Sequence, residues 1–114
     1  MAEYEWARLR ADELRKYSQD DTVVILPVAA LEQHGPHLPV MVDSRLAEEV
    51  SKRTASLGRA KGIPIITLPV VWHGLSEHHM PFGGTVSLTS NTFFLVVRDL
   101  IKSISRHGFS KFLI

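Results

Sequence analysis

A carboxylate and two histidines stand close together in residues 31–39, which read Leu-Glu-Gln-His-Gly-Pro-His-Leu-Pro, and Asp43 follows shortly after. Glu32 and His34 are two residues apart, so in an extended backbone both side chains point to the same side. The glycine and prolines of the segment let the chain fold back, so that Asp43 can reach the same place. Carboxylates and imidazoles together bind divalent cations. We therefore expect a divalent-metal site formed by Glu32, His34 and Asp43.

These residue types also have ordinary structural roles. Aspartate is favoured as the N-cap of a helix, and Asp43 stands where the next helix should begin. A carboxylate has enough lone pairs to cap a helix and bind a cation as well. An isolated loop histidine is usually only solvated or hydrogen bonded. Five of the six histidines, however, fall in the two loops that follow predicted strands, and this clustering favours a site: His34, His37, His73, His78 and His79.

The elements that position these residues alternate between strands and helices. Residues 22–28, 63–68 and 111–114 are mainly apolar, which is typical of buried parallel strands. Helices are expected over 6–17, from a cap at Asp43 or Ser44 to Leu57, and from caps at 89–91 to His107, with Gly58 and Gly108 as stop signals. This order predicts an α/β fold with a mostly parallel sheet, helices on both faces and right-handed crossovers. The candidate ligands then lie past the carboxyl ends of strands, where open α/β sheets bind their ligands.

Two further segments carry specific expectations. In the second helix, Leu46, Ala47, Val50 and Thr54 have the spacing of one buried helix face. The connection over residues 70–87 is long for a compact domain, and its aromatic, histidine and glycine content favours a functional loop. Trp72 in this loop has the alternative role of a core residue, and Gly83 and Gly84 that of turn residues.

Composition excludes several classes of protein. At 114 residues, 45% apolar and 22% charged, the chain has the balance of one globular domain. The formal charge is +1 without a block of like charges, so we expect no nucleic acid or membrane partner. No apolar run reaches the roughly 18 residues of a membrane span, and no signal-peptide pattern is present, so we expect a cytoplasmic protein. Because cysteine is absent, any metal must bind to histidine and carboxylate.

The last residues, 111–114, belong to a predicted strand rather than to a polar linker. We therefore expect residues 1–114 to be the N-terminal portion of a single larger α/β domain, truncated after its third strand. A second polypeptide that completes the domain is the alternative to a simple fragment.

Several motifs together resemble the creatininase (creatinine amidohydrolase) family. They are Leu26-Pro27-Val28, the Glu-x-His-Gly-Pro-His-x-Pro segment with Asp43, Gly74-x-Ser76-Glu77-His78, and Phe82-Gly83-Gly84-Thr85-Val86-Ser87-Leu88. The resemblance implies a mostly parallel α/β fold, a homo-oligomer, often a hexamer, and hydrolysis of a C–N bond in a small cyclic or linear amide. It also implies two divalent metal ions, either zinc, manganese or iron, which activate a water molecule.

Carried onto this sequence, the resemblance implies that Glu32 binds one metal, His34 binds the other and Asp43 bridges both. His37 would lie beside the ligands or on the substrate side, and His78 would shape the mouth of the active site. The family pattern continues with further ligands that these 114 residues lack, so we expect this chain alone to bind metal weakly and to be inactive. The alternative is a non-catalytic fragment or structural subunit, which keeps the fold but lacks a complete metal site.

Overall fold

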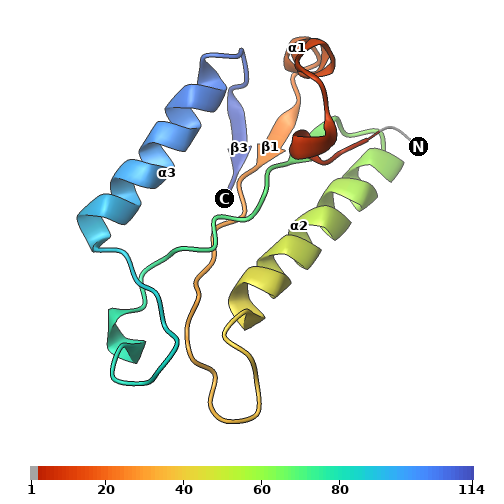
Figure 1. Cartoon of the computed structure of the whole chain (residues 1–114). Helices are drawn as coiled ribbons and strands as arrows, with labels where there is room; N and C mark the ends of the chain where they lie inside the picture. The colour runs from red at the N-terminus through yellow and green to blue at the C-terminus, as the bar shows by residue number, and fades with distance from the viewer. Residues whose placement is uncertain (1–2) are drawn as a thin grey trace.

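The computed structural model describes residues 3–114 and contains a three-stranded parallel sheet in the order β2-β1-β3 (Figure 1). The strands are β1 (Val23–Ile25), β2 (Ile65–Thr67) and β3 (Lys111–Leu113). The predicted parallel sheet is confirmed, but each strand is shorter than the apolar run that predicted it. After β1, the Leu26 N–H still donates to the Leu113 carbonyl at 2.9 Å. Pro27 then follows and has no N–H to continue the ladder.

Helices cover both faces of this sheet, as expected. Val23 and Ile25 of β1 face α2 (Val42–Ala60), whose Ala55 is fully buried against them. Val24, between them, faces the other side and packs in a cluster with Ile104 of α3 (Ser90–Ser105). That second cluster also receives apolar side chains from the N-terminal segment, which contains the 3-10 turn η1 (Trp6–Arg8) and α1 (Ala11–Gln19): Trp6, Leu9, Leu14 and Tyr17.

The prediction of one helix over residues 6–17 is wrong. Leu9 and Arg10 have extended backbone angles and separate η1 from α1. The break is stabilised because the Arg10 N–H donates to Glu13 Oε2 at 2.8 Å, which caps the start of α1. The segment before η1 adds to the edge of the sheet, since the Thr67 N–H donates to the Tyr4 carbonyl at 2.8 Å.

Gly58 does not end α2, contrary to prediction. The helix continues to Ala60, and Gly62, with φ of +78°, reverses the chain instead. A Cβ on Gly58 would lie 2.9 Å from Ile65 Cγ2, so the glycine allows close contact between α2 and β2. Gly108, with φ of +94°, does follow the end of α3 as predicted.

The predicted inner face of α2 is also wrong. Leu46 and Val50 are 58% and 61% exposed, whereas Ser51 and Ala55 are the buried residues of this helix. Small side chains face the sheet because α2 lies close to it. Val50 borders a groove of about 230 Å³ between α2 and the end of β3, where Leu113 and Ile114 are also exposed.

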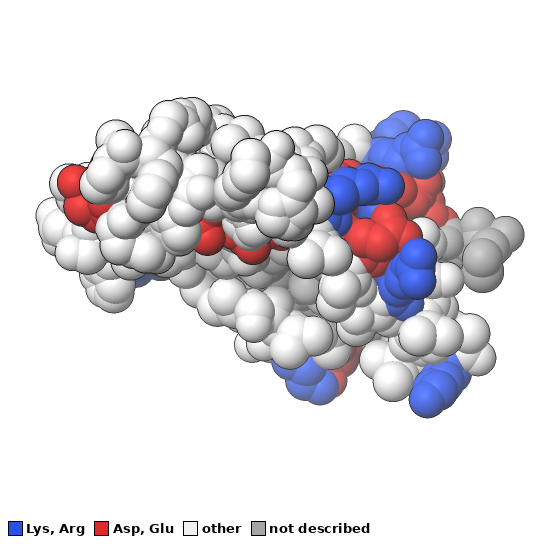
Figure 2. Space-filling view, turned by 90° about the horizontal axis from the view of Figure 1, so that it is seen from below, with Lys and Arg blue, Asp and Glu red and all other residues white. Residues whose placement is uncertain are grey.

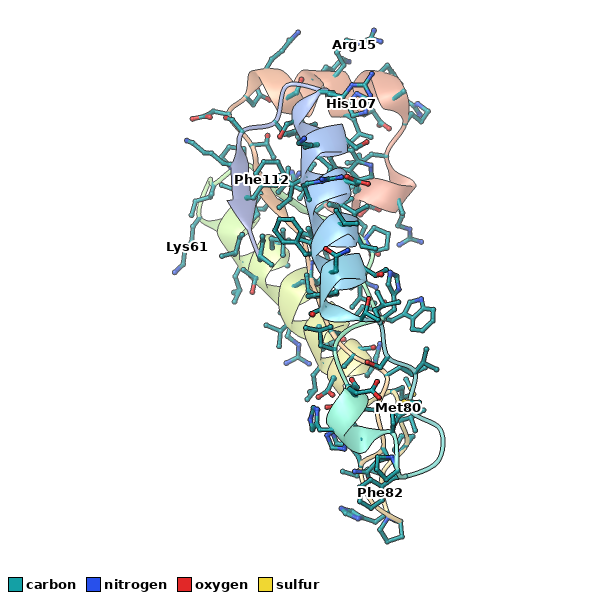
Figure 3. All side chains as sticks on the ribbon, turned by 90° about the vertical axis from the view of Figure 1, so that its left-hand side faces the viewer. Arg15, Lys61, Met80, Phe82, His107 and Phe112 are labelled. Carbon is teal, nitrogen blue, oxygen red and sulfur yellow. The ribbon has the colours of Figure 1, made fainter. Side chains whose placement is uncertain are left out.

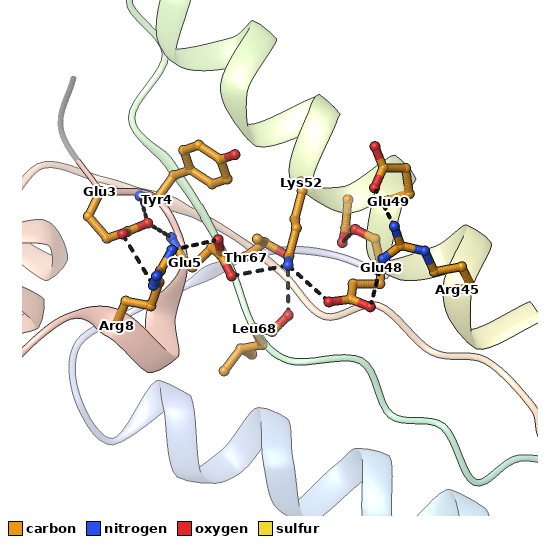
Figure 4. A network of polar contacts seen from close by, with 11 residues as sticks. Glu3, Tyr4, Glu5, Arg8, Arg45, Glu48, Glu49, Lys52, Thr67 and Leu68 are labelled. Carbon is orange, nitrogen blue, oxygen red and sulfur yellow. Dashed lines mark hydrogen bonds and ion pairs between the residues drawn. The ribbon is translucent and has the colours of Figure 1, made fainter. Parts of the chain in front are cut away.

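The charged residues mainly bind one another across the surface. Lys52 of α2 contacts Glu48 at 2.9 Å and Glu5 at 3.3 Å, and so ties the N-terminal segment to this helix (Figure 4). On the face shown in Figure 2, Lys and Arg alternate with Asp and Glu at one end, and the rest is largely uncharged. Among the described residues, no helix combines the length and the hydrophobicity that crossing a membrane would require.

Candidate metal centre

Two loops that follow β1 and β2 extend together from the sheet and form the candidate site. Two backbone hydrogen bonds join the loops. The Ala29 N–H donates to the Val71 carbonyl at 2.8 Å, and the Val86 N–H donates to the Leu31 carbonyl at 2.9 Å. The second loop contains the 3-10 turn η2 (Glu77–His79). In Figure 3, Met80 and Phe82 of this loop lie at the end of the molecule opposite Arg15 and His107. The loop over residues 70–87 is thus packed against the first loop, and the function predicted for it stays a prediction.

Gly74 allows the two loops to come this close. A Cβ at this position would lie 2.2 Å from the Ala29 carbonyl oxygen, far inside any real contact distance. Trp72, two residues before Gly74, is 45% exposed within residues 3–114, which contradicts its alternative role as a core residue of this part of the fold. Gly74 therefore holds the second loop against the residues that lead into Glu32.

The three predicted metal ligands converge. Glu32, His34 and Asp43 each offer a ligand atom within 4.8 Å of the others, and all three side chains are half-buried. His34 Nε2 lies 3.6 Å from Asp43 Oδ1, while His34 Nδ1 lies 3.1 Å from the backbone carbonyl of Glu32. Because that carbonyl can only accept, Nδ1 carries the proton and Nε2 has a free lone pair directed to Asp43. This is the tautomer that a metal-binding histidine requires.

Asp43 does not cap the helix. Met41 occupies the N-cap and its side chain makes no capping hydrogen bond, while Asp43 lies in the first turn of α2. The start of the helix is held instead by Ser44, whose Oγ donates to the Ala30 carbonyl at 2.8 Å. The Asp43 carboxylate is thus free for another role, close to the positive end of the helix dipole.

The two carboxyl groups strongly affect each other. Burial raises the pKa of Asp43 above its ordinary value, and the neighbouring Glu32 carboxylate raises it further. Burial also acts to raise the pKa of Glu32, but the Ser76 hydroxyl, the Asp43 carboxyl and the nearby imidazoles outweigh it, so the pKa of Glu32 is lowered. Without a cation, the Asp43 carboxyl is therefore harder to ionise than an ordinary aspartate, and the Glu32 carboxyl is easier to ionise than an ordinary glutamate. A divalent cation would relieve this repulsion, so the donor set fits a metal ion.

A second group of possible ligands shares Glu32 and includes His78 and His79. His79 Nε2 lies 3.5 Å from Glu32 Oε2, and the His79 ring contacts the ring of His78, with 4.2 Å between their centroids. The family resemblance implies that His78 shapes the mouth of the active site, but it implies no role for His79. His79 is the less exposed of the two, and only the η2 turn, which the sequence pattern did not indicate, directs it at Glu32.

Other predicted site residues lie apart from these groups or have different surroundings. His37 is exposed and belongs to neither group among the described residues, so its role stays a prediction. His73 Nδ1 is buried without a hydrogen-bond partner in residues 3–114. Within the same range, the fully buried Ser76 hydroxyl also has no partner at strict hydrogen-bonding distance, although it is close enough to Glu32 to lower the pKa of that carboxyl.

Carboxylate and imidazole ligands beyond the carboxyl ends of a parallel α/β sheet define a metal-dependent class of enzyme fold. Comparison with known proteins identifies the family within this class. The family model described as creatinine amidohydrolase (creatininase) matches residues 7–114. The chain therefore belongs to the creatininase family, a family with a metal-dependent amidohydrolase fold.

Curated relatives include a creatinine amidohydrolase of Pseudomonas putida, which is 37% identical over 93 residues. A mycofactocin precursor peptide peptidase of Mycobacterium tuberculosis is 30% identical over 85 residues. These matches cover 77% and 70% of this chain, respectively, but in both cases 34% of the relative. A 3-dehydro-scyllo-inosose hydrolase of Thermotoga maritima is 29% identical and matches 87% of this chain and 30% of that protein. The chain thus spans about a third of the length of these relatives.

Solved structures agree with this assignment. A crystal structure of creatinine amidohydrolase superposes with a TM-score of 0.86 at 30% identity and covers 98% of this chain, which corresponds to 44% of the solved chain. Two further similar structures are described as manganese creatininase and as a mutant creatininase of Zn–Zn type, with TM-scores of 0.85 and 0.84. The predicted α/β fold is confirmed, and the chain accounts for less than half of it.

Proposed function

We propose that this chain supplies part of the metal site of an amidohydrolase, which cleaves a C–N bond in a small cyclic or linear amide. The observation that carries the proposal is the convergence of Glu32, His34 and Asp43 within 4.8 Å beside two loops of a creatininase fold. Relatives described with manganese and with zinc support the use of divalent ions. Iron is a further candidate, because a histidine and carboxylate donor set also accepts iron and metal availability often decides.

In this proposal Glu32 would hold one ion, His34 would hold a second and Asp43 would contribute a carboxylate to both. When bound, such ions polarise an amide carbonyl and lower the pKa of a water molecule. The protein holds its ligands in place beforehand. The Glu32 carbonyl fixes the His34 tautomer, and Ser44 anchors the start of α2 near Asp43. The Asp43 carboxyl must be ionised to bind a cation, and its raised pKa opposes this. His37 is proposed to lie beside the ligands or on the substrate side, and His78 is proposed to shape the mouth of the active site.

Three protein ligands are too few for two ions, since each ion in a site of this kind has about four ligands. We propose that residues 1–114 form the N-terminal portion of the domain. The remaining ligands and most of the substrate pocket would come from residues outside it, in the same or a second polypeptide. The exposed edge of β3 and the apolar groove beside α2 support this proposal, because both would be covered by further structure. Assembly as a homo-oligomer, which could be a hexamer, and a cytoplasmic location stay predictions.

The experiment that tests the proposal is metal analysis of the purified chain, with the intact mass recorded on the same sample. We expect the chain to bind zinc or manganese weakly, and Asp43→Asn to lower the affinity at least tenfold while the fold is retained. Asp99→Asn is the matched control, because Asp99 is an exposed helical aspartate in α3, far from the site in the sequence and not in either ligand group.

The alternative of a non-catalytic fragment predicts no specific metal binding and no difference between the two variants. About two ions per chain, together with a second polypeptide in the mass spectrum, would show instead that a partner completes the site. Equal metal affinity of the wild type and Asp43→Asn would refute the assignment of Asp43.

A further inference from the structure

We propose that His79 is a positioning residue, which donates a hydrogen bond from Nε2–H to the Glu32 carboxylate and does not itself bind a cation. The proposal rests on the proposed function, since Glu32 is assigned there as a metal ligand. It concerns a different question, namely whether His79, like His34, is a ligand. His34 and His79 both lie near carboxylate oxygens, so distance alone does not separate them.

The orientation of the Gln33 side chain provides the first step. The Gly35 N–H donates to Gln33 Oε1 at 2.9 Å, and this contact identifies the oxygen of the amide, because only the oxygen can accept. The other end of the amide is therefore Nε2, which lies 2.7 Å from His79 Nδ1. The backbone of Gln33 is held as well, since its N–H donates to Thr85 Oγ1 at 3.1 Å.

The tautomer of His79 follows from this contact. An amide nitrogen can only donate, so His79 Nδ1 must accept and carries no proton. A neutral imidazole then has its proton on Nε2. His79 Nε2 lies 3.5 Å from Glu32 Oε2, which is longer than an ordinary hydrogen bond, so the proposal requires the two atoms to approach to about 3 Å. A donor therefore faces a carboxylate that can only accept.

This tautomer is the opposite of that of His34. His34 has its proton on Nδ1, bound to a backbone carbonyl, and a free lone pair on Nε2. His79 has one lone pair, on Nδ1, and Gln33 occupies it. A metal-binding nitrogen needs a free lone pair. His34 is thus prepared to bind a cation, and His79 is prepared to orient one oxygen of Glu32 and leave the other for the cation.

Nitrogen NMR of the histidine side chains in the metal-free chain tests the tautomers directly. We expect His79 to show a pyridine-type Nδ1 and a pyrrole-type Nε2, and His34 to show the reverse, with signals assigned through His79→Gln and His34→Gln. On addition of zinc, His34 Nε2 should shift and the His79 pattern should persist. A pyridine-type Nε2 on His79, or a zinc-induced shift of that nitrogen, would overturn the proposal. This readout stands even if zinc binding, and with it the proposed function, fails.

Zinc affinity of substituted chains gives a second readout. His79→Gln places an amide donor close to the position of the imidazole Nε2, so it should keep most of the affinity. His79→Ala should lose about 10- to 100-fold, the usual effect of removing a group that orients a metal ligand. His107→Ala, an exposed histidine near the opposite end of the molecule (Figure 3), is the control. If the Gln and Ala variants of His79 lose affinity equally, the donor role of Nε2 is refuted.

Discussion

Gly74→Ala is expected to separate the two loops that form the site, and its effect follows from one distance. The added Cβ would lie 2.2 Å from the Ala29 carbonyl oxygen, whereas real Cβ contacts are essentially never shorter than 3.0 Å. The two backbones must therefore move apart by about 0.8 Å, the difference between these distances. The obstacle is backbone on both sides, so no side-chain rotation relieves it.

The cost has two parts. Forcing an extra carbon into a closely packed position typically costs about 1–3 kcal/mol. The movement also weakens neighbouring backbone hydrogen bonds, such as that from Leu88 to the Gly74 carbonyl at 2.9 Å, each of which contributes about 1 kcal/mol. We expect a loss of about 2–4 kcal/mol in the free energy of unfolding, together with weaker zinc binding, because Ala29 leads into the segment that carries Glu32.

Urea unfolding followed by circular dichroism measures the effect as a lower midpoint at unchanged slope. Gly83→Ala is the control, because Gly83 has no positive φ and no described atom lies within 4 Å of the position that an added Cβ would take. The stability of this control should therefore change by less than about 0.5 kcal/mol. A loss below about 1 kcal/mol for Gly74→Ala, or an equal loss for both variants, would refute the reasoning.

Two other predictions concern α2 and the carboxyl pair. Gly58→Ala gains about 1 kcal/mol of helix propensity but places Cβ 2.9 Å from Ile65 Cγ2. We expect a net loss of about 1 kcal/mol in the free energy of unfolding, measured in urea. A net gain would show that β2 moves away from the added carbon at little cost. Because the pKa of Asp43 is raised in the folded protein, its contribution to metal-free stability is present at low pH and is lost as pH rises through that pKa. Glu32, with its lowered pKa, acts in the opposite direction. Zinc binding should release protons in the pH range in which Asp43 is still partly protonated, which calorimetry in two buffers detects; Asp43→Asn should release fewer.

The sequence predicted the type and order of the main elements well, because three apolar runs alternated with helical patterns. It failed where tertiary contacts decided the detail. Leu46 and Val50 follow the spacing of a buried helix face, yet the close approach of α2 to β2 selects the small residues Ser51 and Ala55 for that face. The wrong prediction at Gly58 has the same cause. This glycine permits close contact between α2 and Ile65, whereas the sequence pattern indicated only a helix end.

The candidate site was predictable in part for a related reason. Glu32 and His34 are two residues apart in an extended segment, so local geometry places both side chains on the same side. The position of Asp43 was predictable because the next helix begins only a few residues later in the sequence. His79 reaches Glu32 only through the η2 turn and the contact between two loops 46 residues apart, as the Gln33 to His79 pair shows. No local pattern reports such a contact, and His78 and His79 are therefore indistinguishable in the sequence.

The exposed apolar side chains of α2 and β3 are consistent with the incomplete ligand set. A helix that is apolar on the side away from its sheet usually has a second packing partner, because an isolated apolar surface is costly in water. Leu46, Val50 and Leu57 form such a side on α2, and Ile114 is 67% exposed beside the groove. The same addition of structure that would cover this surface would extend the sheet past β3. Further loops would then stand at the carboxyl end of the sheet, where they would supply the additional ligands that the proposed ions need beside Glu32, His34 and Asp43.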